Sequence, residues 1–318
     1  MIRNYLFVDY ATQAYLLLVV LLVLLFHGGT VPYWPLLIVA HLFGIAIVHW
    51  LVNVYARAPQ RVELSFFRHF YPILLYAPFY REIGALNQMF ATGVFDHQVI
   101  RADQWLFGFQ PGLELMDRFP SVWVSEVMYF SYFSYYVMIV GVGLALFLRN
   151  RRQFFHFVSV TSFVFFCCYL AYIFYPVVGP RVFYSTVPGY VLPADLQALY
   201  PAVTFPVAVQ DGVFFQIMGV LYDYFEPSGA AFPSSHVAVA IATATFSTRY
   251  LPRVRALHWF MVVMMSTSTV YCRYHYAVDV LAGALTALLL IPIAQWLYRR
   301  FGGAPANAGG AAGYSGRS

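Results

Sequence analysis

Long apolar runs separated by short polar segments constrain the fold of this chain more than any other feature. Of its 318 residues, 61% are hydrophobic and 10% are charged, whereas a soluble domain has roughly 45–50% apolar and about 25% charged residues. The apolar surplus has to face lipid, where α-helices satisfy their own backbone hydrogen bonds. The sequence therefore predicts an integral membrane protein of the all-α class.

A helix needs about 20 apolar residues to cross the ~30 Å hydrocarbon layer. The candidate spans are Tyr10–His27, Pro35–Tyr55, Val122–Leu148, Phe154–Val178, His236–Leu251, Ala256–Tyr271 and Ala277–Leu297. An eighth candidate, Phe66–Tyr80, contains two prolines and two ionisable side chains, so it is equally typical of an interfacial or broken helix. We expect a polytopic helix bundle with seven, possibly eight, transmembrane helices.

Arginine clusters predict the orientation of the bundle, because cytoplasmic loops carry an excess of basic residues. The clusters are Arg149, Arg151 and Arg152; Arg249, Arg253 and Arg255; and Arg299 and Arg300. All three clusters lie on one side of the membrane if Phe154–Val178 and His236–Leu251 each cross it once. We expect that side to be the cytoplasm of a bacterial cell, inside its inner (plasma) membrane. Arg57 and Arg61 also prefer that side, which favours eight crossings; seven would leave the amino terminus outside.

The chain divides into four expected parts. Amino-terminal transmembrane helices occupy residues 1–60, and an amphipathic or interfacial segment occupies 61–121 on the non-cytoplasmic face. A core follows over 122–301, with a short helix expected at Val207–Phe225. The tail over 302–318 is rich in Gly, Ala and Ser, a composition typical of disorder.

Two histidines and an aspartate lie at the non-cytoplasmic ends of apolar runs. His236 ends a Phe-Pro-Ser-Ser-His string, and His275 and Asp279 are four residues apart. A charge at the bilayer centre costs about 2.5–3.5 kcal/mol or more, so ionisable residues at matching ends indicate a polar site at one membrane face. On a helix, Asp279 can accept a hydrogen bond from one ring nitrogen of His275 and leave the other as a nucleophile or base. A buried polar pair that only joins two helices would show the same spacing.

Further residues near these three could bind a phosphate. Ser234 and Ser235 follow a proline and precede His236, a pattern typical of a helix start, and helix amino termini suit phosphates. Arg181 lies just past the end of an apolar run, and Arg273 just before the second histidine. Either guanidinium could bind a phosphate, and either could instead extend to lipid head groups.

The combined pattern resembles the type 2 phosphatidic acid phosphatase (PAP2) superfamily. The second motif of that family is Pro-Ser-Gly-His, matched by His236, and the third is Ser-Arg-x5-His-x3-Asp, matched by His275 and Asp279. The order of the motifs and the single span between them also match. The resemblance covers about Phe154–Leu297 and implies a six-helix core with a catalytic site.

This resemblance implies metal-independent chemistry without a cofactor. His275 would attack phosphorus to give a phosphohistidine, Asp279 would orient His275, and His236 would protonate the leaving alcohol. Water or a second alcohol would then release the phosphoryl group. The residues expected to hold the non-bridging oxygens are Arg181, Ser234, Ser235 and Arg273.

Three departures from the superfamily pattern resemble one of its branches. Ser235 stands where most members have glycine, the first motif reads Gly-Pro-Arg without lysine, and Thr269 replaces an arginine six residues before His275. With the segment that holds Asp96 and Asp103, they resemble the inositol phosphorylceramide synthases, to which sphingomyelin synthases are similar. Those enzymes of sphingolipid metabolism move a phospho-head-group from a phospholipid onto a lipid alcohol, so we expect an inositolphosphotransferase-like enzyme.

Other functions stay open at this point. A lipid phosphate phosphatase acting on phosphatidate- or prenyl-phosphate-type substrates shares the first half-reaction. A transporter is less favoured because the two halves show no repeat and the polar groups lie at span ends, and the intact histidines and aspartate argue against an inactive scaffold. The expected partners are a phospholipid or lipid phosphate, a lipid or polyol acceptor, and membrane lipids. A net charge of +5 gives little reason to expect nucleic acid.

Overall fold

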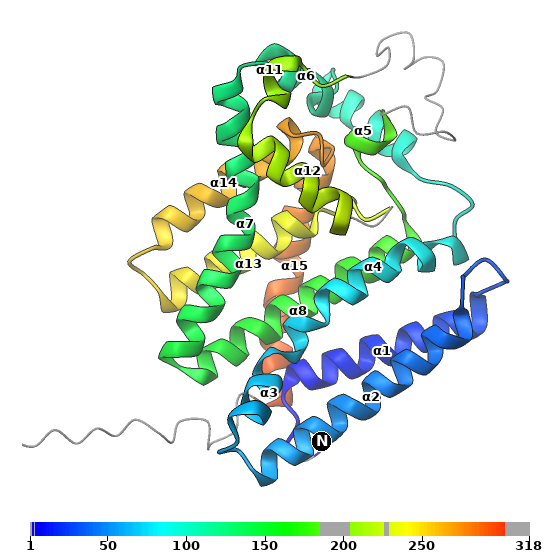
Figure 1. Ribbon diagram of the computed structural model, residues 1–318, viewed down its shortest axis with the longest axis vertical. Helices are drawn as coiled ribbons and strands as arrows, with labels where there is room; N and C mark the ends of the chain where they lie inside the picture. Colours follow the sequence, from blue (N-terminus) through cyan, green and yellow to red (C-terminus); the bar gives the residue numbers. More distant parts are fainter. Residues whose placement is uncertain (1, 3, 185–203, 226–228, 303–318) are drawn as a thin grey trace, which may run out of the picture.

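The computed structural model describes residues 2, 4–184, 204–225 and 229–302 (Figure 1). Its helices are α1 (Phe7–Phe26), α2 (Trp34–Arg57), α3 (Val62–Leu74), α4 (Tyr76–Leu86), η1 (Asn87–Met89), α5 (Asp96–Phe107), α6 (Pro111–Arg118), α7 (Val122–Arg149), α8 (Arg151–Phe174), α9 (Pro180–Phe183), α11 (Val207–Gln210), α12 (Val213–Phe225), α13 (Ser235–Tyr250), α14 (Arg255–Tyr271) and α15 (Ala277–Phe301). Within these residues there is no strand, only an isolated bridge between Val177 and Ala230. The expected all-α class is confirmed. The tail predicted to be disordered lies, from residue 303 onward, outside the described residues.

Five helices are long and apolar enough to cross a membrane: α1, α2, α7, α8 and α15. The two other runs predicted to span are the shorter helices α13 and α14, with 16 and 17 residues. At 1.5 Å per residue, α13 reaches about 24 Å, less than the ~30 Å hydrocarbon layer. Five spans therefore rest on length and composition, and the count of seven or eight remains a prediction.

The eighth candidate span is a broken helix. Residues 66–80 fall on α3 and α4, which meet at Leu75. Pro72 lies in the last turn of α3, where its missing N–H removes one helical hydrogen bond. Both short helices pack along α8 (Figure 1). A buried ion pair of 2.7 Å between Arg68 and Asp9 joins α3 to α1.

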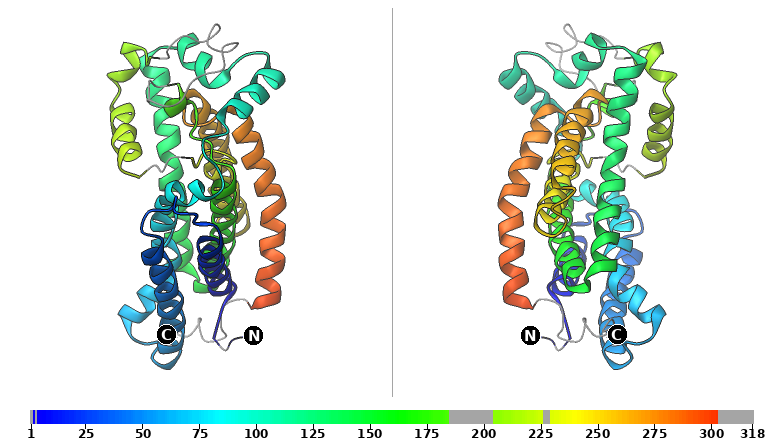
Figure 2. Two further views of the ribbon diagram at one scale, coloured as in Figure 1. Left: turned by 90° about the vertical axis from the view of Figure 1, so that its right-hand side faces the viewer. Right: turned by 90° about the vertical axis from the view of Figure 1, so that its left-hand side faces the viewer.

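The three arginine clusters lie together at one end of the bundle. Arg149 donates a hydrogen bond of 3.0 Å to the carbonyl of Tyr250, which joins the α7–α8 turn to the end of α13. Arginines from α8, α13 and α15 line one cavity there. Because α13 and α15 both end there, the predicted site residues at their first turns lie at the opposite end (Figure 2).

The end that carries the histidines is covered by short helices. α5 packs against α15, α6 packs against α14, and α11 and α12 lie beside α7 (Figure 1). The helix expected over Val207–Phe225 is broken at Asp211 and Gly212, where the Glu126 carboxylate accepts the N–H of Phe214 at 2.9 Å. A Cβ atom on Gly212 would lie 2.4 Å from that carboxylate. Gly212 therefore permits the close approach of the Glu126 carboxylate between α11 and α12.

Candidate active site

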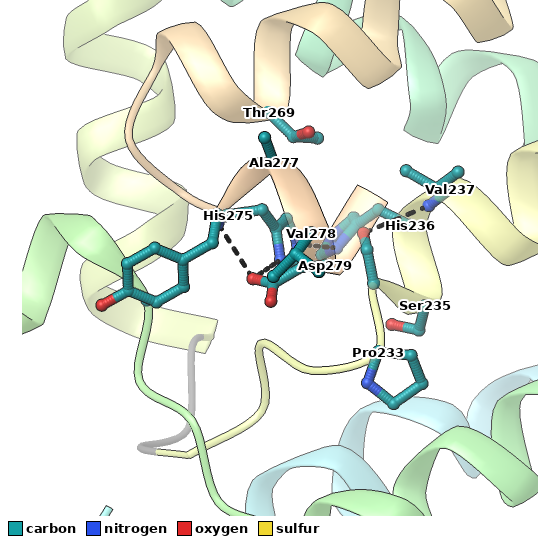
Figure 3. A network of polar contacts seen from close by, with 12 residues as sticks. Pro233, Ser235, His236, Val237, Thr269, His275, Ala277, Val278 and Asp279 are labelled. Carbon is teal, nitrogen blue, oxygen red and sulfur yellow. Dashed lines mark hydrogen bonds and ion pairs between the residues drawn. The ribbon is translucent and has the colours of Figure 1, made fainter. Parts of the chain in front are cut away.

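The two histidines and the aspartate meet where α13 and α15 begin (Figure 3). Nε2 of His275 lies 3.4 Å from Nδ1 of His236, and Nδ1 of His275 lies 3.3 Å from Oδ2 of Asp279. His236 and His275 are 8% and 3% exposed, and Asp279 is fully buried. Residues 39 positions apart along the chain are therefore in direct contact.

A tight turn between α14 and α15 holds His275. Arg273 adopts a positive φ of 64°, and the N–H groups of Tyr274 and His275 both donate to the carbonyl of Thr269, at 2.9 and 3.1 Å. Asp279 accepts the N–H of Tyr276 at 2.9 Å through the oxygen that also faces His275. One carboxylate therefore both caps α15 and positions the imidazole.

The direction of the hydrogen bonds follows from Asp279. The Asp279 oxygen that faces His275 already accepts the N–H of Tyr276, so we assign it as the acceptor of a proton on Nδ1 of His275, which leaves a lone pair on Nε2 of that ring. Nδ1 of His236 then donates to that lone pair, and Nε2 of His236 accepts from the hydroxyl of Tyr132 at 3.0 Å. Burial and the neighbouring His236 lower the pKa of His275 well below its usual range, which keeps this imidazole neutral. Tyr132 lies 104 residues before His236, and no local sequence pattern marks it as a partner of that histidine.

The two serines shape the start of α13. The Ser234 side chain accepts the N–H of Val237 at 3.4 Å as an N-cap, and the N–H of Ser235 donates to the Tyr172 hydroxyl at 3.0 Å. Gly283 of α15 packs against this turn, since a Cβ atom there would lie 2.4 Å from the Ser234 carbonyl. The small residue lets α13 and α15 approach closely beside the histidines.

The two predicted phosphate-binding arginines have different surroundings. The guanidinium carbon of Arg181 lies among aromatic rings, 5.0 Å from the ring centre of Tyr222 and 5.4 Å from that of Tyr274. Tyr274 directly precedes His275 in the sequence. Arg273 is 1% exposed and forms an ion pair of 2.8 Å with Asp117 of α6. The structure therefore places Arg181 beside the turn that holds the histidine, and engages Arg273 with α6.

Two buried carboxylates on α5 bind the backbone of the site. Asp96 accepts the N–H groups of Val178 and Gly179, both at 2.9 Å, and the hydroxyl of Tyr276 at 2.8 Å. Asp103 accepts the N–H groups that open α15, as described below. Burial raises the pKa of Asp96 to about 6, against the lowering effect of these hydrogen bonds. Asp96 therefore joins the loop at Val178 and Gly179, which precedes Arg181, to the turn that carries His275.

Asp103 caps α15 from a distant part of the chain. Its two oxygens accept the N–H groups of Ala277 and Val278 at 3.0 and 2.8 Å. Burial raises the pKa of Asp103 also to about 6. These groups are the free donors at the helix amino terminus, so Asp103 holds the helix that carries Asp279. In the sequence, both α5 aspartates stand out only as part of a segment that resembles one branch of the superfamily, and that resemblance predicts no role for them.

An apolar cavity of about 510 Å³ opens beside His236 and Ser235. Helices α3, α4, α7, α8, α12 and α13 contribute to its walls, and the tyrosines among them are Tyr76, Tyr80, Tyr132, Tyr135, Tyr136, Tyr169 and Tyr222. This volume lies within the roughly 300–1,000 Å³ typical of ligand pockets. The cavity gives an apolar group direct access to His236.

Comparison with known families agrees with this geometry. The pattern of the PAP2 superfamily matches residues 97–293, more than half of the chain, and includes α5 from its second residue onward as well as the three motif segments. The chain therefore belongs to the PAP2 superfamily. Members are generally phosphatases or phosphotransferases that act on lipid phosphates. No curated protein and no solved structure matches the chain.

Proposed function

We propose that this protein is a membrane enzyme that cleaves a phosphate ester of a lipid and transfers the phosphoryl or phospho-head-group through a phosphohistidine on His275. The observation that carries the proposal is the contact of 3.4 Å between the imidazoles of His236 and His275, with Asp279 behind the second ring. Membership of a superfamily that acts on lipid phosphates supports it.

The proton positions assign a role to each catalytic group. The lone pair on Nε2 of His275 attacks phosphorus, and a P–N bond forms as the P–O bond to the lipid breaks. Beside the negatively charged phosphate, His236 takes up a second proton; as an imidazolium it gives its Nδ1 proton to the leaving oxygen, which has taken the bonding electrons, and returns to the neutral ring. Asp279 stabilises the positive charge that develops on the His275 ring. In the second half-reaction, His236 takes a proton from the acceptor hydroxyl, which attacks phosphorus and frees His275.

Substrate binding has to separate the two imidazoles. A nucleophile about 3–3.5 Å from phosphorus, with a further hydrogen bond to the leaving oxygen, does not fit between nitrogens 3.4 Å apart. The cavity beside His236 gives that ring room to move. We propose that Arg181, Ser234 and Ser235 hold the phosphate oxygens at the start of α13. Arg273 would join them by exchanging its ion pair with Asp117 for the phosphate.

Transfer to an alcohol is favoured over hydrolysis by the burial of both histidines, which limits access of water. The apolar cavity suits the chain of a lipid acceptor. With the sequence departures at Ser235 and Thr269, these features support an inositolphosphotransferase-like reaction. A lipid phosphate phosphatase is the second candidate and would require water to reach the same phosphohistidine. The metal-independence of either reaction is part of this proposal.

The site is proposed to face the non-cytoplasmic side of a bacterial inner membrane. All three arginine clusters lie at the other end of the bundle, the end expected in the cytoplasm. In this arrangement α3 and α4 together cross the membrane once. With the five longer helices and with α13 and α14, the protein then crosses the membrane eight times. Both ends of the described chain then lie on one side, as the 5.6 Å distance between the rings of Tyr10 and Phe301 supports.

Mass spectrometry of lipids tests the proposal. Purified protein would be incubated in detergent with a phospholipid mixture and no added metal, with and without inositol or ceramide. A new head-group lipid identifies a transferase, whereas only diacylglycerol or free phosphate identifies a phosphatase. Activity should be absent in His275→Ala and retained in His27→Ala, a histidine in the α1–α2 turn. Full activity of His275→Ala would contradict the proposal.

A further inference from the structure

A second cavity, of about 350 Å³, lies at the arginine end of the bundle. Three arginines line it, one each from α8, α13 and α15: Arg152, Arg249 and Arg299. His156 and Gln153 of α8 also line it, and among the residues that the structure describes no aspartate or glutamate does. The cavity is therefore positively charged and is built from three separate helix ends.

His156 gives this cavity a buried polar group. Its side chain is 7% exposed, its ring stacks on Tyr298 with centres 4.3 Å apart, and its Nδ1 lies 2.8 Å from the Tyr250 hydroxyl. Among the described residues, its Nε2 has no hydrogen-bond partner, nor has Oε1 of Gln153. Buried polar atoms without partners are rare in folded proteins. When Tyr250 donates to Nδ1, the proton of the imidazole lies on Nε2, which becomes a donor for an anion.

The surroundings favour a phosphate over other anions. Basic pockets between transmembrane helices on the cytoplasmic side suit phosphate-bearing head groups. Guanidinium groups match the oxygens of a phosphate in geometry as well as in charge. The amino terminus of the 24-residue helix α8 contributes positive potential at the same place, whereas the carboxyl ends of α13 and α15 contribute negative potential, so the net charge comes from the arginines and not from the helix ends. Simple enrichment of arginine in cytoplasmic loops would explain the charges but not the buried, unpartnered His156.

This cavity is distinct from the proposed active site. Helix α13 has His236 in its first turn and Arg249 in its last turn, and 16 helical residues extend about 24 Å. A single phosphate group cannot bridge the two places. An inference about the second cavity therefore does not depend on the proposed reaction.

We propose that the cavity binds the phosphate group of an anionic ligand at the membrane surface. Arg249 and Arg299 supply the charge, and His156 supplies a directed N–H donor from its Nε2. The ligand is the head group of an anionic phospholipid or a free phosphate, which present the same chemistry to these side chains.

Binding to the full chain in phosphatidylcholine nanodiscs tests the proposal. Short-chain phosphatidylglycerol and inorganic phosphate would be titrated separately, with the bound fraction read by native mass spectrometry. Arg249→Gln and Arg299→Gln should each weaken binding by about tenfold or more, the effect of losing a hydrogen bond to a charged group. Arg255→Gln and Arg300→Gln remove the same charge at the same end but lie outside the cavity, so they should change affinity by less than about twofold.

Each outcome decides the proposal or identifies the source of the phosphate. Binding of phosphatidylglycerol alone identifies a lipid head group, and competing binding of inorganic phosphate identifies a free anion. His156→Phe, which keeps a stacked ring on Tyr298, should weaken both; if its melting temperature shows misfolding, the arginine comparison decides. Equal weakening by all four arginine variants, or no saturable binding of either probe, would overturn the proposal.

Discussion

At the scale of single residues, the position of one proton decides what the two histidines can do. Asp279 accepts from Nδ1 of His275 at 3.3 Å, so the free lone pair of that ring points toward His236. Tyr132 donates to the far side of His236 and leaves the proton of that ring pointing back. A nucleophile and an acid therefore face each other without any change of tautomer.

Replacing Asp279 by Asn tests this proton arrangement. The amide keeps the shape, but its NH₂ group can face His275 and favour the wrong tautomer. We expect kcat to fall by about 10²–10⁴-fold, as when the orienting acid of a triad is amidated. Steady-state release of the lipid product measures it, with the melting temperature as a check on folding. Wild-type kcat in Asp279→Asn would contradict the role assigned to the carboxylate.

Tyr132→Phe should have a milder effect. The change removes the hydroxyl that donates to Nε2 of His236 but keeps the ring that stacks on Tyr274 at 4.5 Å. Loss of one neutral hydrogen bond, about 0.5–1.5 kcal/mol, corresponds to roughly 2–10-fold in kcat. Tyr136→Phe, on the same helix and lining the same cavity, serves as the control. Equal effects of the two changes would show that His236 does not depend on Tyr132.

At the scale of elements, α5 holds two motif segments in place through Asp96 and Asp103. Asp103→Ala leaves the N–H groups of Ala277 and Val278 without their acceptor. We expect it to destabilise the fold by about 1–3 kcal/mol, the cost of unsatisfied buried donors. Thermal unfolding in one detergent measures the loss, with the exposed Asp211→Ala as the control. A melting temperature unchanged in Asp103→Ala would contradict the capping role.

The same carboxylates predict that enzyme activity falls on the acid side of its pH profile. Burial raises the pKa of Asp96 and Asp103 to about 6, so each is ionised above that pH and protonated below it. Protonation takes away one acceptor from the backbone of the site, and activity should therefore fall as the pH drops below about 6. His275 does not account for this decline, because burial lowers its pKa. Asp103→Asn should reduce activity at neutral pH and make the decline of activity toward acid pH shallower. A decline of wild-type shape in both Asp103→Asn and Asp96→Asn would contradict this prediction.

Local sequence patterns predicted the parts of the site that lie within one element or its turn. The four-residue spacing predicted the contact of His275 with Asp279, although His275 lies in the turn before α15 and not, as expected from the sequence, on the helix. The serines before His236 predicted the start of α13. Contacts between distant elements were not predictable in this way. Asp103 reaches Ala277 across 174 residues, and Arg273 is engaged by Asp117, 156 residues away. Neither partner carries a local signal.

At the scale of the whole molecule, the bundle has a basic end and an opposite end that carries the site. The fold class and most helix positions followed from apolar runs, because lipid selects long helices. The two prolines of residues 66–80 indicated the break between α3 and α4 as one alternative, and the runs His236–Leu251 and Ala256–Tyr271 already matched the short α13 and α14. The packing of α3 and α4 along α8 was not visible in composition. The proposed orientation places the arginine clusters in the cytoplasm and α6 outside it.

Accessibility of introduced cysteines tests this orientation. In a background with Cys167, Cys168 and Cys272 replaced by alanine, Arg118→Cys on α6 should react with a membrane-impermeant maleimide in intact cells. Arg253→Cys, in the α13–α14 turn, should react only after permeabilisation. The two changes remove the same charge, so they control for each other. The reverse pattern would place the site on the cytoplasmic face.

The most direct test of the central claim is to trap the covalent intermediate. Protein would be quenched during turnover of a lipid labelled on its phosphorus, then digested and mapped by mass spectrometry. We expect an acid-labile, base-stable adduct on the peptide that contains His275, absent from His275→Gln. An adduct on another residue, or turnover by His275→Gln, would contradict the proposal that this imidazole takes the phosphoryl group.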